Sequence, residues 1–255
     1  MLETDSNTSS GPWVRVRKAR GAWPLGRAER EVGVVDRSTG PIGYRIAKAV
    51  LGRPIHRAYD IEIDGLGRLP EGPIILAANH RSFMDSIFMA LVVDRPVSFL
   101  AKAEYFDRRR TAWIFRTTGQ IPLRRGSPAG ARRALDAALG VLAGGGTIGV
   151  YPEGTRSRDG LLHRGNLGPA RLAVTSGAPI VPIGIVGTDA VQAPDQRLPR
   201  VGKHVTIRFG SPIHLNSRGE TDRTYLRDMT DVLMTDIADL CAQQYIDHDA
   251  PLTKV

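Results

Sequence analysis

The sequence contains one cysteine and no long apolar run. A single cysteine, Cys241, cannot form a disulfide within the chain, which excludes a disulfide scaffold or a cysteine-rich zinc protein and is typical of a reducing compartment. No segment approaches the roughly 18 to 20 apolar residues that a membrane-spanning helix requires. The N-terminal residues also lack the basic and apolar regions of a secretory signal peptide. We therefore expect a protein that neither spans a membrane nor carries an export signal, and that is able to lie on a membrane surface.

Lysine is scarce as well, so almost all of the positive charge comes from arginine. The 255 residues include 5 Lys and 30 Arg against 26 acidic residues, and the formal net charge is +9. Such an excess favours anionic partners: nucleic acid, an acidic membrane surface or a phosphorylated substrate. The chain is 42% apolar and 24% charged, which is enough to build one large core and excludes a disordered, collagen-like or coiled-coil chain.

The N-terminal part of the chain is basic, and apolar residues at helical spacing begin only after residue 36. Residues 1–36 are rich in Gly and Arg and have no apolar periodicity, which predicts a flexible basic tail, either solvated or in contact with lipid or nucleic acid. In residues 37–57, Ile42, Ile46 and Val50 share one face of a predicted helix that has a basic flank. This amphipathic helix either docks in the headgroup layer of a membrane or packs its apolar face on the domain, and both interpretations remain open here.

Strands alternate with helices through residues 58–250. Strands are predicted over residues 59–64, 73–78, 96–101, 120–123, 147–151, 180–186 and 204–209, and helices over residues 83–93, 129–142, 169–175 and 221–245. This alternation predicts an α/β fold: a single domain with a mostly parallel or mixed central sheet flanked by helices. Open sheets of this kind place their sites at strand ends, so the turns that follow the strands are the segments to search for chemistry.

The first polar cluster, NHRSFMD at residues 79–85, directly follows a predicted buried strand. His80 lies in the turn before a helix, so it can fold back toward Asp85 in the first helical turn. Asp85 would then accept a hydrogen bond from one ring nitrogen and leave the other to accept a substrate proton. In the alternative, Ser82 and Asp85 only form a capping box at the start of the helix, and His80 is an ordinary hydrogen-bonded histidine.

Two further clusters are weaker when taken singly. The segment YPEGTRS at residues 151–157 predicts a tight turn that exposes backbone N–H groups, and Arg156 can fork onto a phosphate or carboxylate. Glutamate and arginine this close together are often only a surface pair. In GQIPLRRG, residues 119–126, Arg124 and Arg125 follow a short strand, a position where bases are commonly just solvated.

Taken together, the order and spacing of these motifs resemble the glycerolipid acyltransferases of the PlsC type, the lysophosphatidate acyltransferases. The family carries NHxSxxD, Gly-x-(Ile/Val)-x-x-x-Arg, EGTRS and V-P-(Ile/Val) elements, which match residues 79–85, 119–125, 153–157 and 180–183 within a resemblance that covers residues 60–209. The resemblance implies the PlsC-like acyltransferase fold. It also implies transfer of an acyl chain from acyl-CoA or acyl carrier protein to the free hydroxyl of 1-acylglycerol 3-phosphate, giving phosphatidic acid.

The resemblance also implies a role for each matching residue. His80 would be the general base, and Asp85 would orient and charge its imidazole. The other assignments are substrate phosphate binding by Lys102, Arg124, Arg125 and Arg156, an acceptor pocket and turn formed by Glu153, Gly154, Thr155 and Ser82, and Gly119 as the oxyanion candidate. A thioester is already activated, so direct attack needs a base and an oxyanion donor but no covalent enzyme intermediate. No bound cofactor or metal is therefore expected, and the acyl thioester is a co-substrate.

The expected partners are a lysophospholipid acceptor, the acyl thioester donor and an anionic membrane, with the protein peripheral at its cytoplasmic face. Glycerol 3-phosphate, another lysophospholipid or a glycolipid remains possible as acceptor, in part because Arg164 stands where many relatives have Lys. Two other classes of protein fit parts of the sequence. A nucleic-acid-binding module fits the basic surplus, but the arginines are dispersed and no nucleic-acid motif is present. A metal hydrolase would have only His80, Asp85 and Glu153 as a thin set of ligands.

Overall fold

A computed structural model describes residues 41–124, 126–216 and 222–251 of the chain. The predicted basic tail, residues 1–36, lies outside the described residues, and so does Arg125. The first described element is helix α1 (Ile42–Ala58), which falls in the region expected to form an amphipathic helix. It is held against the domain by the Tyr44 hydroxyl, which donates to the Ala90 carbonyl at 3.0 Å.

Seven strands form one mixed sheet. They are β1 (Asp60–Asp64), β2 (Ile74–Ala78), β3 (Val97–Lys102), β4 (Ile121–Leu123), β5 (Thr147–Val150), β7 (Ile180–Val186) and β8 (His204–Phe209). The order across the sheet is β1-β8-β7-β2-β5-β3-β4, and every neighbouring pair is parallel except β7 with β8. The expected α/β fold with a mixed central sheet is confirmed, and each predicted strand forms within one residue of its expected bounds.

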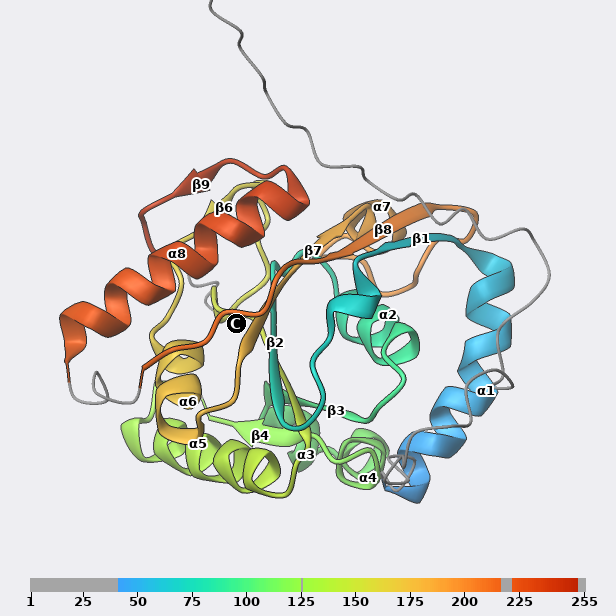
Figure 1. The fold of residues 1–255 in the computed structure, drawn as a ribbon. Helices are drawn as coiled ribbons and strands as arrows, with labels where there is room; N and C mark the ends of the chain where they lie inside the picture. Colours follow the sequence, from blue (N-terminus) through green and yellow to red (C-terminus); the bar gives the residue numbers. More distant parts are fainter. Residues whose placement is uncertain (1–40, 125, 217–221, 252–255) are drawn as a thin grey trace, which may run out of the picture.

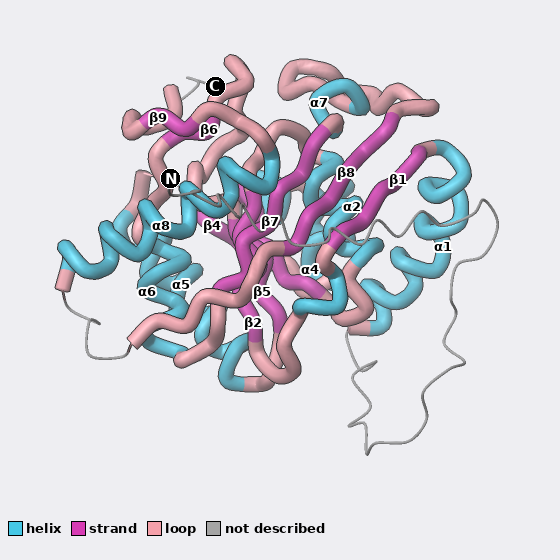
Figure 2. Tube along the Cα trace, turned by 45° about the horizontal axis from the view of Figure 1, so that its top comes forward, coloured by secondary structure: helices cyan, strands magenta, loops and turns pink. Residues whose placement is uncertain are grey.

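Helices cover both faces of this sheet (Figure 1). One face carries α2 (Met84–Val92), with α1 beyond it; the other carries α5 (Pro128–Ala143), α6 (Gly168–Ser176) and α8 (Arg223–Cys241). The short elements are the 3-10 helix η1 (Leu66–Arg68) and the helices α3 (Glu104–Asp107), α4 (Arg109–Thr117) and α7 (Thr188–Val191). Figure 2 shows the same arrangement, with the strands between two groups of helices.

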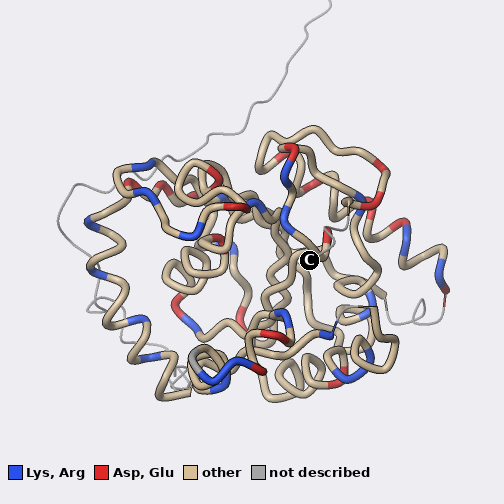
Figure 3. Tube along the Cα trace, turned by 180° about the vertical axis from the view of Figure 1, so that it is seen from behind, with Lys and Arg blue, Asp and Glu red and all other residues tan. Residues whose placement is uncertain are grey.

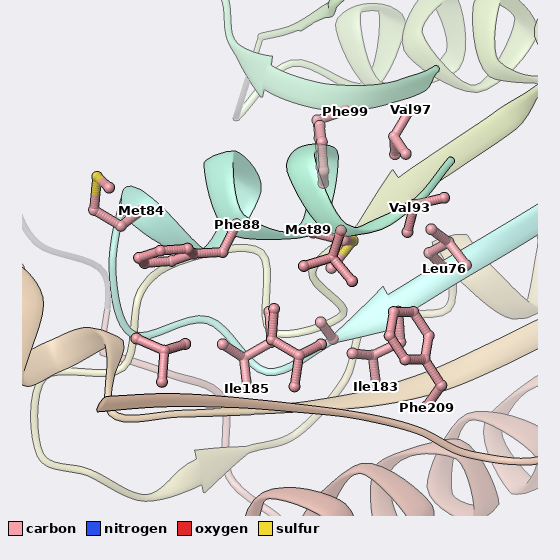
Figure 4. Close-up of a cluster of buried hydrophobic side chains, with 14 of the residues drawn as sticks. Leu76, Met84, Phe88, Met89, Val93, Val97, Phe99, Ile183, Ile185 and Phe209 are labelled. Carbon is pink, nitrogen blue, oxygen red and sulfur yellow. The ribbon is translucent and has the colours of Figure 1, made fainter. Parts of the chain in front are cut away.

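The alternation of side chains along the central strand β2 builds two cores. Leu76 packs in the cluster under α2, while its neighbour Ile75 packs in the cluster under α5, α6 and α8. In the first core, Phe88 of α2 lies over Ile185, and Met89 of the same helix lies near Leu76 and Ile183 (Figure 4). Such buried side chains each contribute roughly 1.5–3 kcal/mol. A strand buried on both faces is therefore held rigidly at its carboxyl end, where the polar turn begins.

The C-terminal helix ends earlier than the sequence predicted. We expected it to reach Tyr245, but α8 ends at Cys241 because Ala242 adopts a left-handed conformation with φ of 55°. The chain then forms a two-residue strand, β9 (Tyr245–Ile246), parallel to β6 (Leu162–His163). Strands of two residues have no periodicity that a sequence reveals.

Candidate active site

The turn between β2 and α2 brings His80 and Asp85 together. His80 Nδ1 lies 2.8 Å from Asp85 Oδ2, and the same oxygen accepts the backbone N–H groups of Arg81 and Ser82 at 2.8 Å each. Asp85 is fully buried, whereas the His80 side chain keeps 15% of its surface exposed. With Nδ1 donating to the carboxylate, Nε2 is left as a proton acceptor. One carboxylate oxygen thus serves both the helix start and the histidine, so the two interpretations of Asp85 are compatible.

Asn79 fixes the point from which this turn departs. Its Nδ2 donates to the Ile185 carbonyl at 2.9 Å, and its Oδ1 accepts the Ile185 N–H at 2.8 Å. These bonds continue the pairing of β2 with β7 beyond the last strand residue. The sequence puts Asn79 in the polar cluster but does not indicate this role, because only the strand order shows that β7 lies beside it.

The turn after β5 wraps around the backbone of His80. Glu153 Oε1 accepts the His80 N–H at 3.1 Å, and the Ser157 N–H donates to the His80 carbonyl at 2.7 Å. The other Glu153 oxygen accepts the His163 N–H at 3.0 Å. Glu153 is only 5% exposed, and burial raises its pKa to about 7 despite these bonds. Because both oxygens are taken by backbone groups, Glu153 connects two loops instead of offering a free carboxylate to a substrate.

Gly154 occupies a position where a side chain does not fit. Its φ is 71°, its N–H donates to the Tyr151 carbonyl at 2.9 Å, and a Cβ placed there would lie 2.9 Å from Asn166 Nδ2. Asn166 in turn donates to the Pro152 carbonyl at 2.9 Å. These contacts hold the EGTRS turn closed. The half-buried Thr155 follows Gly154 and directly precedes Arg156.

Positively charged residues extend along the same edge of the sheet. Lys102 ends β3 and Arg124 follows β4; at about 4.8 Å per strand they lie roughly 10 and 14 Å from the end of β2. Arg156 is four residues beyond the turn's proline and next to Ser157, which is bonded to His80. Neither Lys102 nor Arg156 pairs with a carboxylate of the described part of the chain, and Arg124 makes only an exposed 3.9 Å contact with Asp107. Cations that have no partner carboxylate in the described part of the chain, on the sheet edge where His80 lies, favour an anionic substrate.

The oxyanion role predicted for Gly119 is wrong. Gly119 precedes β4, which runs parallel to β3, so it lies at the amino end of the strands, beside Ser98 and away from His80. Its N–H donates to the Arg116 carbonyl at 3.2 Å, and the N–H of Gln120 donates to Phe115 at 2.9 Å. Both amides are used to end α4, so neither is available to an oxyanion. Arg125, from the same motif, lies outside the described residues.

The histidine also makes an aromatic contact that its sequence motif does not predict. The ring of Tyr151 stacks on the imidazole of His80, with centroids 3.8 Å apart and planes 11° apart. The Tyr151 and Ser86 hydroxyls share a hydrogen bond of 2.7 Å. The one signal in the sequence is that Tyr151 ends a predicted strand two residues before EGTRS. Within residues 41–124, 126–216 and 222–251, no three His, Cys, Asp or Glu side chains converge as metal ligands.

Known proteins are similar to this chain in sequence and in fold. Residues 60–186 match the family model described as Acyltransferase. Curated relatives include the chloroplastic 1-acyl-sn-glycerol-3-phosphate acyltransferase LPAT1 of Arabidopsis thaliana, 30% identical over 66% of this chain and 48% of the relative. A 1-acyl-sn-glycerol-3-phosphate acyltransferase of Pseudomonas aeruginosa is 30% identical over 48% of each chain. A lyso-ornithine lipid O-acyltransferase of the same species is 28% identical over 64% of this chain and 61% of the relative.

A solved structure agrees with these matches. The 1-acyl-sn-glycerophosphate acyltransferase PlsC from Thermotoga maritima superposes with a TM-score of 0.59 and 25% identity, over 77% of this chain and 82% of that one. The chain therefore belongs to the PlsC-type glycerolipid acyltransferase family. It spans about half the length of the plant relative.

Proposed function

We propose that this protein transfers an acyl chain from acyl-CoA or acyl carrier protein to the free hydroxyl of 1-acylglycerol 3-phosphate, giving phosphatidic acid. The observation that carries the proposal is the His80–Asp85 pair, with Nε2 left as an acceptor, at a sheet edge that also carries Lys102 and Arg156, two cations that pair with no carboxylate of the described residues. The names of the plant and bacterial relatives support the same acceptor.

In the proposed reaction His80 Nε2 removes the proton of the acceptor hydroxyl while its oxygen attacks the thioester carbonyl. The tetrahedral intermediate then expels the thiolate, which takes the proton from the imidazolium, so an ester and a free thiol are formed and His80 returns to its neutral state. Asp85 stabilises the transient imidazolium through the 2.8 Å contact with Nδ1. General-base catalysis of this kind contributes a factor of about 10² to 10⁴. Arg156 and Lys102 hold the acceptor phosphate.

The proposal includes docking on an anionic membrane through α1 and α4. Three apolar side chains of α1, spaced four residues apart, are exposed: Ile42 by 75%, Ile46 by 58% and Val50 by 64%. Trp113 of the adjacent α4 is 63% exposed. These three side chains of α1 are thus largely exposed, whereas Ile55 of the same helix packs on the core. α1 carries Arg and Lys but no Asp or Glu (Figure 3). Exposed apolar groups framed by bases suit the headgroup layer at the cytoplasmic face.

No helix of the described residues is long and apolar enough to cross a membrane. Contact through α1 would therefore be peripheral, and its strength would depend on anionic lipid and salt.

An acceptor panel tests the proposed function. Purified protein receives palmitoyl-CoA with 1-acylglycerol 3-phosphate, glycerol 3-phosphate, lysophosphatidylethanolamine or lyso-ornithine lipid, and mass spectrometry identifies the products. We expect phosphatidic acid as the main product. Faster acylation of another acceptor would identify that acceptor as the substrate in place of 1-acylglycerol 3-phosphate. If no acceptor gave a product, the proposed function would be refuted.

A further inference from the structure

The imidazole of His80, the candidate catalytic histidine, is the last of three stacked aromatic rings that lie on or just after neighbouring strands. Tyr151, directly after β5, covers one face of the His80 imidazole at 3.8 Å, and its plane lies 11° from that of Phe99 on β3, with centroids 6.0 Å apart. The sheet order β2-β5-β3 places the three residues in this sequence. His80 therefore does not stand free in a cleft; one of its faces rests against the end of the central strands.

The outer end of the Tyr151 ring is anchored separately. Its hydroxyl shares a 2.7 Å hydrogen bond with Ser86, which adjoins Asp85 in the first turn of α2. The ring thus joins the end of β5 to the helical turn that supplies the carboxylate. Burial, reinforced by the nearby charge of Asp85, raises the pKa of Tyr151 well above its usual value, so the hydroxyl stays protonated.

We propose that Tyr151 is a positioning residue for His80: its ring fixes the plane of the imidazole, so that Nδ1 stays on Asp85 and Nε2 stays directed at the acceptor hydroxyl. The bond to Asp85 holds the imidazole at one atom only, and a planar group held at one atom can still tilt. A parallel ring at 3.8 Å removes that tilt on one side. The electron-rich ring face also favours the imidazolium that forms during the reaction. This inference rests on the proposed function, in which His80 is the base.

The kinetic test compares four variants. Tyr151→Leu removes the ring, and we expect kcat to fall roughly 10- to 100-fold with KM for the acceptor changed less than about twofold, because geometry is lost and binding is not. Tyr151→Phe keeps the ring, and Ser86→Ala removes only the hydroxyl contact; both should keep kcat within a factor of about three. The control Phe209→Leu removes a fully buried ring from the same core on β8. It should lower Tm without changing kcat.

A measurement that needs no activity completes the test. In proton–carbon spectra of protein with labelled histidine, the His80 ring protons should be shifted upfield by the neighbouring ring in the wild type and in Tyr151→Phe. They should move downfield in Tyr151→Leu. Wild-type kcat in Tyr151→Leu, or a fall in kcat matched by Phe209→Leu, would overturn the inference. An inactive wild type would instead refute the proposed function, and unmoved His80 signals would then refute the stack as well.

Discussion

Replacing Asp85 with Asn separates its two structural roles. Asp85 Oδ2 accepts three hydrogen bonds: two from backbone N–H groups at the start of α2 and one from His80 Nδ1. Asn is isosteric and keeps one oxygen as an acceptor, so the turn is retained while the charge is lost. A hydrogen bond to a charged group is worth about 1 kcal/mol more than a neutral one. The two backbone bonds together therefore lose roughly 2 kcal/mol.

For a chain of this size, a loss of about 2 kcal/mol lowers Tm by roughly 4–8 °C. The third bond acts on the rate, because it stabilises the imidazolium and fixes the tautomer. Its loss should lower kcat roughly 10²- to 10⁴-fold. Thiol release from palmitoyl-CoA with the acceptor present gives kcat, and thermal unfolding gives Tm. The rates of the wild type and the variant are compared at a temperature below the Tm of the variant.

A matched control removes a helix cap far from the histidine. Ser127 Oγ accepts the Gly130 N–H at 3.1 Å at the start of α5, and Ser127→Ala should cost about 1 kcal/mol with kcat unchanged. If Asp85→Asn lowered Tm but kept wild-type kcat, Asp85 would serve only the helix start, and the reasoning that makes it the partner of the base would be refuted.

Three further predictions follow from the charges and exposed groups. Arg156→Gln should raise KM for 1-acylglycerol 3-phosphate about 10- to 100-fold with little change in kcat, since a contact of roughly 1.5–3 kcal/mol is lost; an unchanged KM in initial-rate assays would contradict it. Burial raises the pKa of Glu153 from 4.5 to about 7, so the native state holds an extra proton between these values and wild-type unfolding free energy falls as pH rises through them. The unfolding free energy of Glu153→Gln lacks this pH dependence. Measured in denaturant titrations, it should rise by about 3 kcal/mol relative to that of the wild type between pH 4.5 and about pH 8. A difference between the two proteins that stays constant with pH would refute the assignment. Ile46→Asp with Val50→Asp should abolish most sedimentation with anionic vesicles while Val232→Asp, an exposed valine of α8, does not; equal sedimentation of all three proteins would exclude α1 as the docking face.

The sheet was predictable because its strands carry strong local patterns. The run of apolar residues in β2 and the alternation in β1 follow directly from whether a strand is buried on two faces or one. The position of His80 in a turn before a helix also gave its approach to Asp85. These features depend on residues close together in the chain, and the structure reproduces them.

Other features depend on which strands become neighbours. The motif at residues 119–125 belongs to the family pattern, yet Gly119 lies at the amino end of β4. The chain reaches the edge of the sheet that carries the site only after it has passed through β4. The Glu153 bonds to His80 and His163, and the Tyr151 stack, join segments up to 73 residues apart. No local periodicity encodes such contacts, so they emerge only once the order β2-β5-β3 is known.

The most direct test of the central claim is thiol release from palmitoyl-CoA with and without 1-acylglycerol 3-phosphate, in the wild type and in His80→Ala. We predict release that requires both the acceptor and His80, with the variant slower by a factor of at least about 10². Release that proceeds without the acceptor would indicate a thioesterase, and acceptor-dependent release that survives His80→Ala would contradict the assignment of His80 as the base.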